Sequence, residues 1–205
     1  DDTAIIEIAY ALRHIPHLIE LDVACNKFGS VGMNGTARVL AHMQFVEVLH
    51  FEHNSIGESS IYGIADMIKH LKRLRVLDLQ DTKLGNEKLY IIFEALKHVS
   101  QSCISNVSPL PQSEVKVSSD TMLNAQPNAG EIMQQPITIS VNNYNMQELN
   151  LCDNALEINS DSQNAIAMLK ALEVLPKLQT FLICHGNTIT IPMEALAATT
   201  KAKIK

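Results

Sequence analysis

The sequence predicts an α/β solenoid with a curved parallel sheet inside and α-helices outside. Two observations support this fold class. A pattern of apolar residues recurs every 28 residues, and apolar residues at three- and four-residue spacing fill the stretches between successive copies. Because one strand–helix unit cannot bury its apolar face alone, such units stack on one another and share a continuous core.

Each copy of the pattern contains a short strand with one apolar face. Apolar residues stand at offsets 0, 3, 5 and 10 from Leu18, Val46 and Leu74, and a glycine follows each block. Alternation along a strand sends successive side chains to opposite faces, so offsets 3 and 5 point inward together. At offset 8, Asn26 and Asn54 can bind backbone groups where the chain turns away, and the third copy has a threonine there.

Two further copies begin near residues 146 and 178, and the last of them places Asn187 one residue late. We therefore expect about five repeats in a single domain that spans residues 1–205, with repeats from about 18, 46, 74, 146 and 178. The surplus between the third and fourth copies, about residues 100–145, is rich in Ser, Asn, Gln and Pro. We interpret it as an insertion loop, and the alternative is a degenerate repeat with a strand over 137–141.

Amphipathic helices are predicted between the strands, because each connecting segment has one apolar face. Residues 1–16 predict a first helix, and the two alternatives for the N-terminal end are a cut repeat or a partial cap formed by this helix. The later helices are predicted over residues 30–44, 58–71, 86–99, 160–175 and 192–203.

The strand pattern is the L-x-x-L-x-L-x-x-N-x-L signature, so the chain resembles leucine-rich-repeat proteins. A 28-residue unit with room for a full helix is similar to the ribonuclease-inhibitor type, which also occurs in Ran GTPase-activating proteins. The resemblance covers roughly residues 3–99 and 146–199. It implies a non-catalytic, scaffold-like module that binds proteins with the concave face of its sheet.

The candidate binding residues follow from the repeat register. Offsets 2, 4 and 6 of each strand point away from the core. Across the first four repeats these twelve positions hold five carboxylates and no Lys or Arg, so an acidic concave wall is predicted. With the turn position that follows them, the predicted partner-binding residues are Glu20, Asp22, His50, Glu52, Asp78, Gln80, Asp81, Glu148, Asn150 and Asp153.

One cluster on this wall could carry chemistry. Asp22, His50 and Asp78 share one register position on adjacent strands, about 4.8 Å apart. A histidine between two carboxylates could be a pH switch or half of a metal site. We favour a histidine that relieves charge repulsion between strands, and we expect no catalytic residue, no metal and no cofactor.

Basic residues gather elsewhere, as Lys69, His70, Lys72 and Arg73 and again as Lys97 and His98. We interpret both groups as cations at helix C-termini, where they complement the helix dipole, in preference to a binding patch.

Composition limits the partner class. The 205 residues are 46% hydrophobic with a net charge of −6, which argues against a disordered chain and against nucleic acid or a membrane as partner. We expect a protein partner of basic or mixed charge, and a homodimer through an uncapped end is an alternative use of the fold. Four widely spaced cysteines favour free thiols and an intracellular (cytoplasmic) setting.

Two functional alternatives remain open. The first is a regulator similar to GTPase activators or enzyme inhibitors. The second is an effector of an intracellular bacterium that binds a host protein after secretion into the host cytosol.

Overall fold

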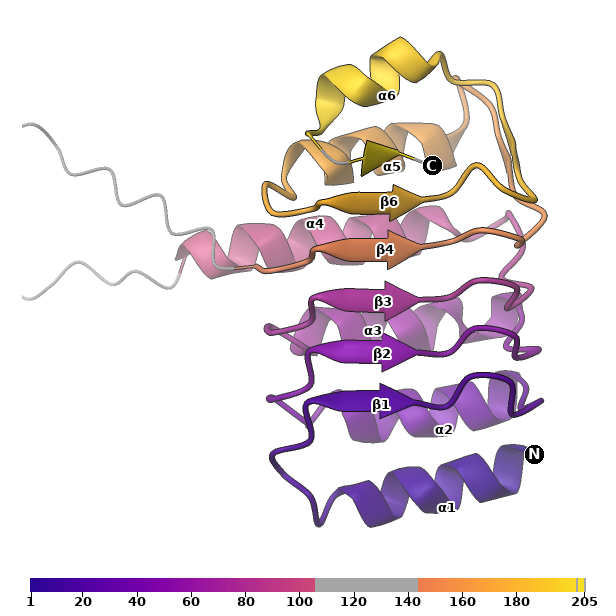
Figure 1. The fold of residues 1–205 in the computed structure, drawn as a ribbon, viewed down its shortest axis with the longest axis vertical. Helices are drawn as coiled ribbons and strands as arrows, with labels where there is room; N and C mark the ends of the chain where they lie inside the picture. The colour runs from indigo at the N-terminus through magenta and orange to yellow at the C-terminus, as the bar shows by residue number, and fades with distance from the viewer. Residues whose placement is uncertain (106–143, 202, 205) are drawn as a thin grey trace, which may run out of the picture.

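The computed structural model describes residues 1–105, 144–201 and 203–204, and it confirms the predicted α/β solenoid (Figure 1). Strands and helices alternate along the chain. The helices are α1 (Asp2–Leu12), α2 (Ser30–Leu40), the short 3-10 helix η1 (Glu58–Ser60), α3 (Ile61–His70), α4 (Tyr90–Ser105), α5 (Gln163–Glu173) and α6 (Met193–Thr199). The strands are β1 (Glu20–Asp22), β2 (Val48–His50), β3 (Val76–Asp78), β4 (Glu148–Asn150), β5 (Glu157–Ile158), β6 (Thr180–Leu182), β7 (Thr188–Ile189) and β8 (Lys203–Ile204).

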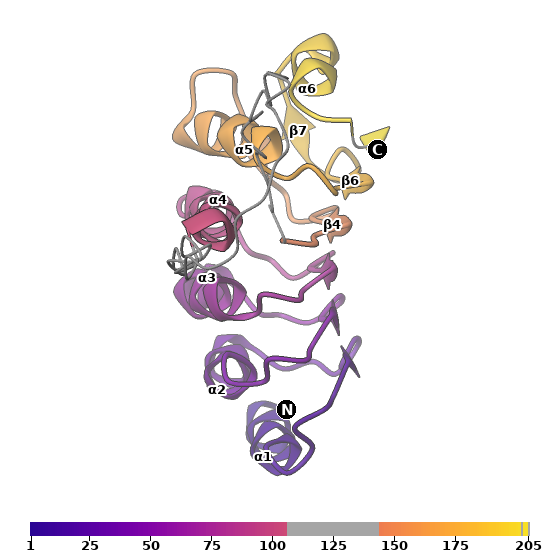
Figure 2. The same ribbon diagram turned by 90° about the vertical axis from the view of Figure 1, so that its left-hand side faces the viewer.

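The main sheet is parallel and has the strand order β1-β2-β3-β4-β6-β8. Figure 2 shows the sheet on one side of the molecule and the helices on the other. The strands pair without any shift in register, so that equivalent positions of successive repeats lie side by side.

The core lies between the sheet and the helices. The middle residues of the first five strands of the sheet pair with one another and have exposed fractions of 0 to 9%. These residues are Leu21, Leu49, Leu77, Leu149 and Phe181. From the helices, residues such as Ile64, Phe93 and Met168 fill the space behind them. Each strand is only three residues long, so the fold depends on packing between repeats more than on any one strand.

Asparagines hold the turns after the strands. The Asn54 side chain is buried, its Oδ1 accepts from the amide of Asn26, and its Nδ2 donates to the carbonyls of Val23 and Phe51. Asn154 and Asn187 make equivalent bonds in later repeats. These contacts explain the asparagine of the repeat pattern, because each side chain satisfies backbone groups of two neighbouring repeats.

The structure differs from the sequence prediction around α4. The helix begins at Tyr90 and continues to Ser105, so it starts later and ends later than the predicted 86–99. The amide of Tyr90 donates to Asn164 Oδ1 (2.8 Å), and the buried Ser100 hydroxyl donates to the carbonyl of Val174. Contacts with α5 and with the residue that follows it therefore determine where α4 begins and stabilise its second half.

Helix α4 occupies the first part of the predicted 100–145 insertion, through Ser105. Strand β3 pairs directly with β4, so the sheet continues across the insertion. The rest of that segment, including the alternative strand over 137–141, lies outside the described residues.

The C-terminal segment also differs from expectation. The predicted helix over 192–203 is shorter, because α6 ends at Thr199 and the chain returns to the sheet as β8. Strands β5 and β7 form a separate two-stranded parallel sheet. Among the described residues, no helix is both long and apolar enough to span a membrane.

Candidate functional site

The predicted binding residues lie on the sheet face that points away from the helices, and we call this face the acidic wall. Its central ladder pairs Asp22 with His50, His50 with Asp78, and Asp78 with Asn150. The neighbouring ladder runs from Glu20 through Val48, Val76, Glu148 and Thr180 to Lys203 of β8, so the acidic part of this face lies on β1 to β4 and its last strand carries an exposed lysine. The register that the repeat pattern predicts is therefore the register of the sheet.

Local hydrogen bonds shape the central ladder. A side-chain oxygen of Asp22, Asp78 and Asn150 accepts in each case from the backbone N–H two residues later. Short side chains with an oxygen on Cγ favour this turn. One step further on, His53, Asp81 and Asp153 adopt positive φ angles of 57°, 47° and 57°. The side chains of the turn position therefore project from a repeated left-handed backbone conformation.

Side chains on the wall also contact one another across repeats. Asn150 Nδ2 donates to Asp78 Oδ2 (2.9 Å), and Gln80 Nε2 donates to Asp153 Oδ2 (2.7 Å). His53 Nδ1 lies 3.2 Å from Asp81 Oδ2. One group of contacts joins the third and fourth repeats through Asp78, Asn150, Gln80 and Asp153, and the separate His53–Asp81 pair joins the second repeat to the third. Both limit the freedom of these side chains before any partner arrives.

The cluster around His50 brings together three groups that can bind a metal. The candidate ligand atoms of His50, Glu52 and Asp78 lie within 4.8 Å of one another, and His50 Nδ1 lies 3.6 Å from Glu52 Oε2. Both oxygens of Asp78 already accept hydrogen bonds, from the Gln80 amide and from Asn150. A histidine that relieves charge repulsion between strands stays our interpretation of this cluster.

The predicted wall residues differ in how far a partner could reach them. Glu20 and Asp22 are exposed, whereas most of the others are half-buried. Asn150 is buried, with an exposed fraction of 5%, and its amide is used within the wall. Among the described residues, the carboxylates of Glu20 and Glu148 have no hydrogen-bond or ion-pair partner, so these two residues can be substituted without breaking a contact within the wall.

Sequence reasoning missed one member of the wall. His185 Nδ1 lies 2.6 Å from Asp153 Oδ1, and the His185 side chain is 82% exposed. This residue stands at offset 7 of the fifth repeat, the same position as His53, Asp81 and Asp153. The sequence signal that could have found His185 is therefore the repeat register, with offset 7 applied to the fifth repeat.

Three cysteines lie near strand ends as free thiols, and their exposure differs. Cys25 is exposed, Cys184 is half-buried and Cys152 is buried. Burial raises the pKa of the Cys152 thiol above its ordinary value of 9.0, because desolvation disfavours the thiolate. A buried thiol with a raised pKa is a poor nucleophile, which fits a structural role.

Comparisons with known proteins agree with this fold. A family model described as leucine rich repeat matches residues 14–34. Comparison with curated proteins gave no match. Among solved structures, the chain is similar to the tropomodulin C-terminal domain of Caenorhabditis elegans at 14% identity and a TM-score of 0.57, covering 95% of this chain and 88% of that one.

At that identity the structural likeness concerns the fold alone, and the ribonuclease-inhibitor subtype remains a prediction. The strand register, the asparagine turns and both matches lead to the same conclusion: the chain folds as a leucine-rich-repeat solenoid.

Proposed function

We propose that this chain is a non-catalytic protein-interaction module whose acidic wall binds a protein partner of basic or mixed charge. The observation that supports the proposal most is the register. It places carboxylates on three of the four strands β1 to β4, on one face and without a lysine or arginine among their outward positions. Leucine-rich-repeat domains generally bind protein partners, and their extended sheet face suits this use.

The wall also has the physical character of a recognition surface. Its central groups are already ordered by hydrogen bonds, so binding costs little additional side-chain entropy. The carboxylates of Glu20 and Glu148 make no contact within the wall and are left for charge pairing with a partner. Such charges contribute chiefly to partner selection and to the association rate.

The best test changes wall carboxylates that make no contact within the wall. Reversing Asp78 or Glu52 would also break contacts within the wall, so a loss of binding would be ambiguous. Glu20→Lys with Glu148→Lys changes the charge of the wall and removes no hydrogen bond among the described residues. Glu7→Lys with Glu173→Lys is the matched control, because both residues are exposed on helices away from the wall.

The experiment is affinity capture from cell lysate with the wild-type chain, the wall variant and the control variant. We expect wild type and control to recover the same proteins and the wall variant to lose them. The binding of a recovered protein, measured directly, should then weaken as salt rises. Equal recovery by all three chains would contradict the proposal.

The same experiment addresses the regulatory alternatives. If a recovered partner is a GTPase or another enzyme, its turnover with and without this chain separates activation or inhibition from plain binding. A host protein recovered selectively by the wall would support the effector alternative.

A further inference from the structure

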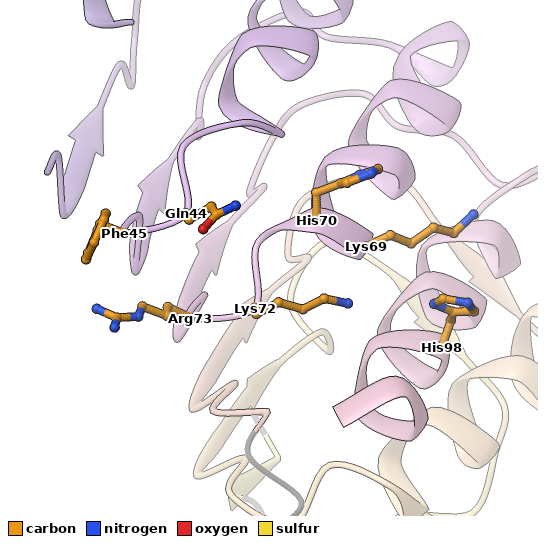
Figure 3. Close-up of a pocket in the computed structure, with 7 residues that line it drawn as sticks. All are labelled: Gln44, Phe45, Lys69, His70, Lys72, Arg73 and His98. Carbon is orange, nitrogen blue, oxygen red and sulfur yellow. The ribbon is translucent and has the colours of Figure 1, made fainter. Parts of the chain in front are cut away.

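A groove runs along the flank of the solenoid where the helices lead into the strands. Its central hollow, about 610 Å³ in volume, lies between the α2–β2 loop, the end of α3 and the middle of α4 (Figure 3). A second hollow shares Gln44 and Phe45 with it and extends to Arg13. A third shares Lys69 and His98 and extends along α4. Because neighbouring hollows share lining residues, the three lie in succession along this flank, from the end of α1 to α4.

The charge of this groove is opposite to that of the wall. Five of the seven residues that line the central hollow are basic. They are Lys69, His70, Lys72, Arg73 and His98, which together with Lys97 we call the basic flank. Glu94 is the sole carboxylate among the described residues that line the three hollows, and it pairs with Lys97 at 2.5 Å. A chain of net charge −6 therefore concentrates positive charge on one edge.

The sequence analysis interpreted these basic residues as cations that complement the dipole at helix C-termini. The structure corrects this interpretation for some of them. Lys69 and His70 do lie in the last turn of α3. Helix α4, however, continues to Ser105, so Lys97 and His98 lie well before its end, beyond the reach of the dipole. Lys72 and Arg73 lie in the turn after α3. Among the described residues, no carboxylate forms an ion pair with Lys69, Arg73 or His98.

The basic groups are spread along the groove. The Arg73 guanidinium lies 4.7 Å from the centre of the Phe45 ring, which positions it without a charged partner. Figure 3 shows Arg73 extending on the same side as Phe45, whereas Lys72 extends the opposite way, in the direction of His98. One compact anion could not contact both ends, but a chain that carries several anionic groups could.

The geometry points to an extended acidic peptide as the occupant of the groove, supplied by a protein partner and carrying carboxylate or phosphate groups. Packed helices lie roughly 8–10 Å apart, so the span from α1 to α4 is about 25–30 Å. An extended peptide covers this span with about eight residues. This is a second binding surface, separate from the acidic wall and independent of it.

The test uses fluorescence anisotropy with an eight-residue Glu-rich peptide, a phosphoserine peptide of equal length and an uncharged Gln peptide. The flank variant is Lys69→Glu with Arg73→Glu. The control variant is Lys170→Glu with Lys177→Glu, in which Lys170 lies in the last turn of α5, as Lys69 does in α3. Lys177 stands immediately before the fifth repeat, as Arg73 stands before the third. Each variant replaces two positive charges by two negative ones, so both change the net charge from −6 to −10.

We expect at least one acidic peptide to bind wild type and control alike, the flank variant to bind it at least about tenfold more weakly, and the Gln peptide not to bind. The relative affinity of the Glu and phosphoserine peptides then identifies the preferred anion. Failure of both acidic peptides to bind, or equal weakening in the two variants, would overturn the proposal. Flank-dependent binding of phosphatidylserine vesicles or of a single-stranded oligonucleotide, without peptide binding, would overturn it in favour of a membrane or a nucleic acid.

Discussion

Replacing Asn54 with alanine tests whether the asparagine turns hold the repeats together. The Asn54 side chain is 2% exposed and makes five hydrogen bonds to the backbone of two repeats. Three of them measure 3.0 Å or less, to the amide of Asn26 (2.9 Å) and the carbonyls of Val23 (3.0 Å) and Phe51 (2.9 Å). The other two, at 3.4 and 3.3 Å, are weaker.

The expected loss follows from these bonds. A net contribution of about 1 kcal/mol for each of the three short bonds gives about 3 kcal/mol. Backbone groups left buried without a partner raise this value, and water that enters the turn lowers it. We therefore expect Asn54→Ala to lower the free energy of unfolding by about 3–4 kcal/mol.

Urea unfolding followed by circular dichroism at 222 nm measures this change, since the chain has no tryptophan. With a urea m-value of roughly 2 kcal/mol/M, the midpoint should fall by about 1.5–2 M. Asn26→Ala is the matched control, because Asn26 is exposed and its side chain donates one bond, to the carbonyl of Ala24. This control should lose less than about 1 kcal/mol. Equal losses in the two variants would refute the structural role of the buried asparagine.

Two further predictions concern other parts of the repeats. Folding opposes loss of the Cys152 proton, so the stability that this thiol contributes is intact below pH 9 and is lost above it, as the pH rises through the raised pKa. Iodoacetamide at pH 8 should accordingly alkylate the exposed Cys25 well before Cys152, and equal rates by mass spectrometry would contradict the burial argument. Arg75 bridges Glu47 (2.8 Å) and Gln147 (3.0 Å) across three repeats with its side chain 33% exposed, so Arg75→Met should lower stability by about 1 kcal/mol in dilute buffer. In 1 M salt the difference should shrink, and a loss that does not depend on salt would assign the effect to packing instead.

The sequence alone predicted strands β1, β2, β3, β4 and β6, their register and the outward face of the sheet, because these follow from local alternation. The short strands β5, β7 and β8 were not predicted. An apolar residue at offset 3 or 5 must face the core, so its neighbours at offsets 2, 4 and 6 must face out. Asp22, His50 and Asp78 therefore pair as predicted. Asn187 stands one residue late in the pattern, yet its amide still reaches the carbonyls of Leu151 and Ile183.

The helix ends could not be predicted in the same way, because contacts between repeats determine them. Helix α4 continues past the predicted end at residue 99, and Ser100 there donates to the carbonyl of Val174, the residue that follows α5. The start of α4 likewise depends on Asn164, which lies 74 residues away in the sequence. Cross-repeat contacts on the wall, such as that between Gln80 and Asp153, depend on side-chain rotamers that no repeat pattern encodes.

The solenoid separates surfaces that differ in charge without any change to its core. Positions such as Glu20 and Glu148 lie on the sheet face, whereas Lys69 and Arg73 lie at the edge that precedes the strands. Because none of these four side chains packs in the core, each surface can change its charge at small cost to stability. Substitutions on the two surfaces should therefore have additive effects if each surface binds its own partner. A single partner that covered both would need a surface of mixed charge, and its binding would respond to the two sets of variants in a coupled way.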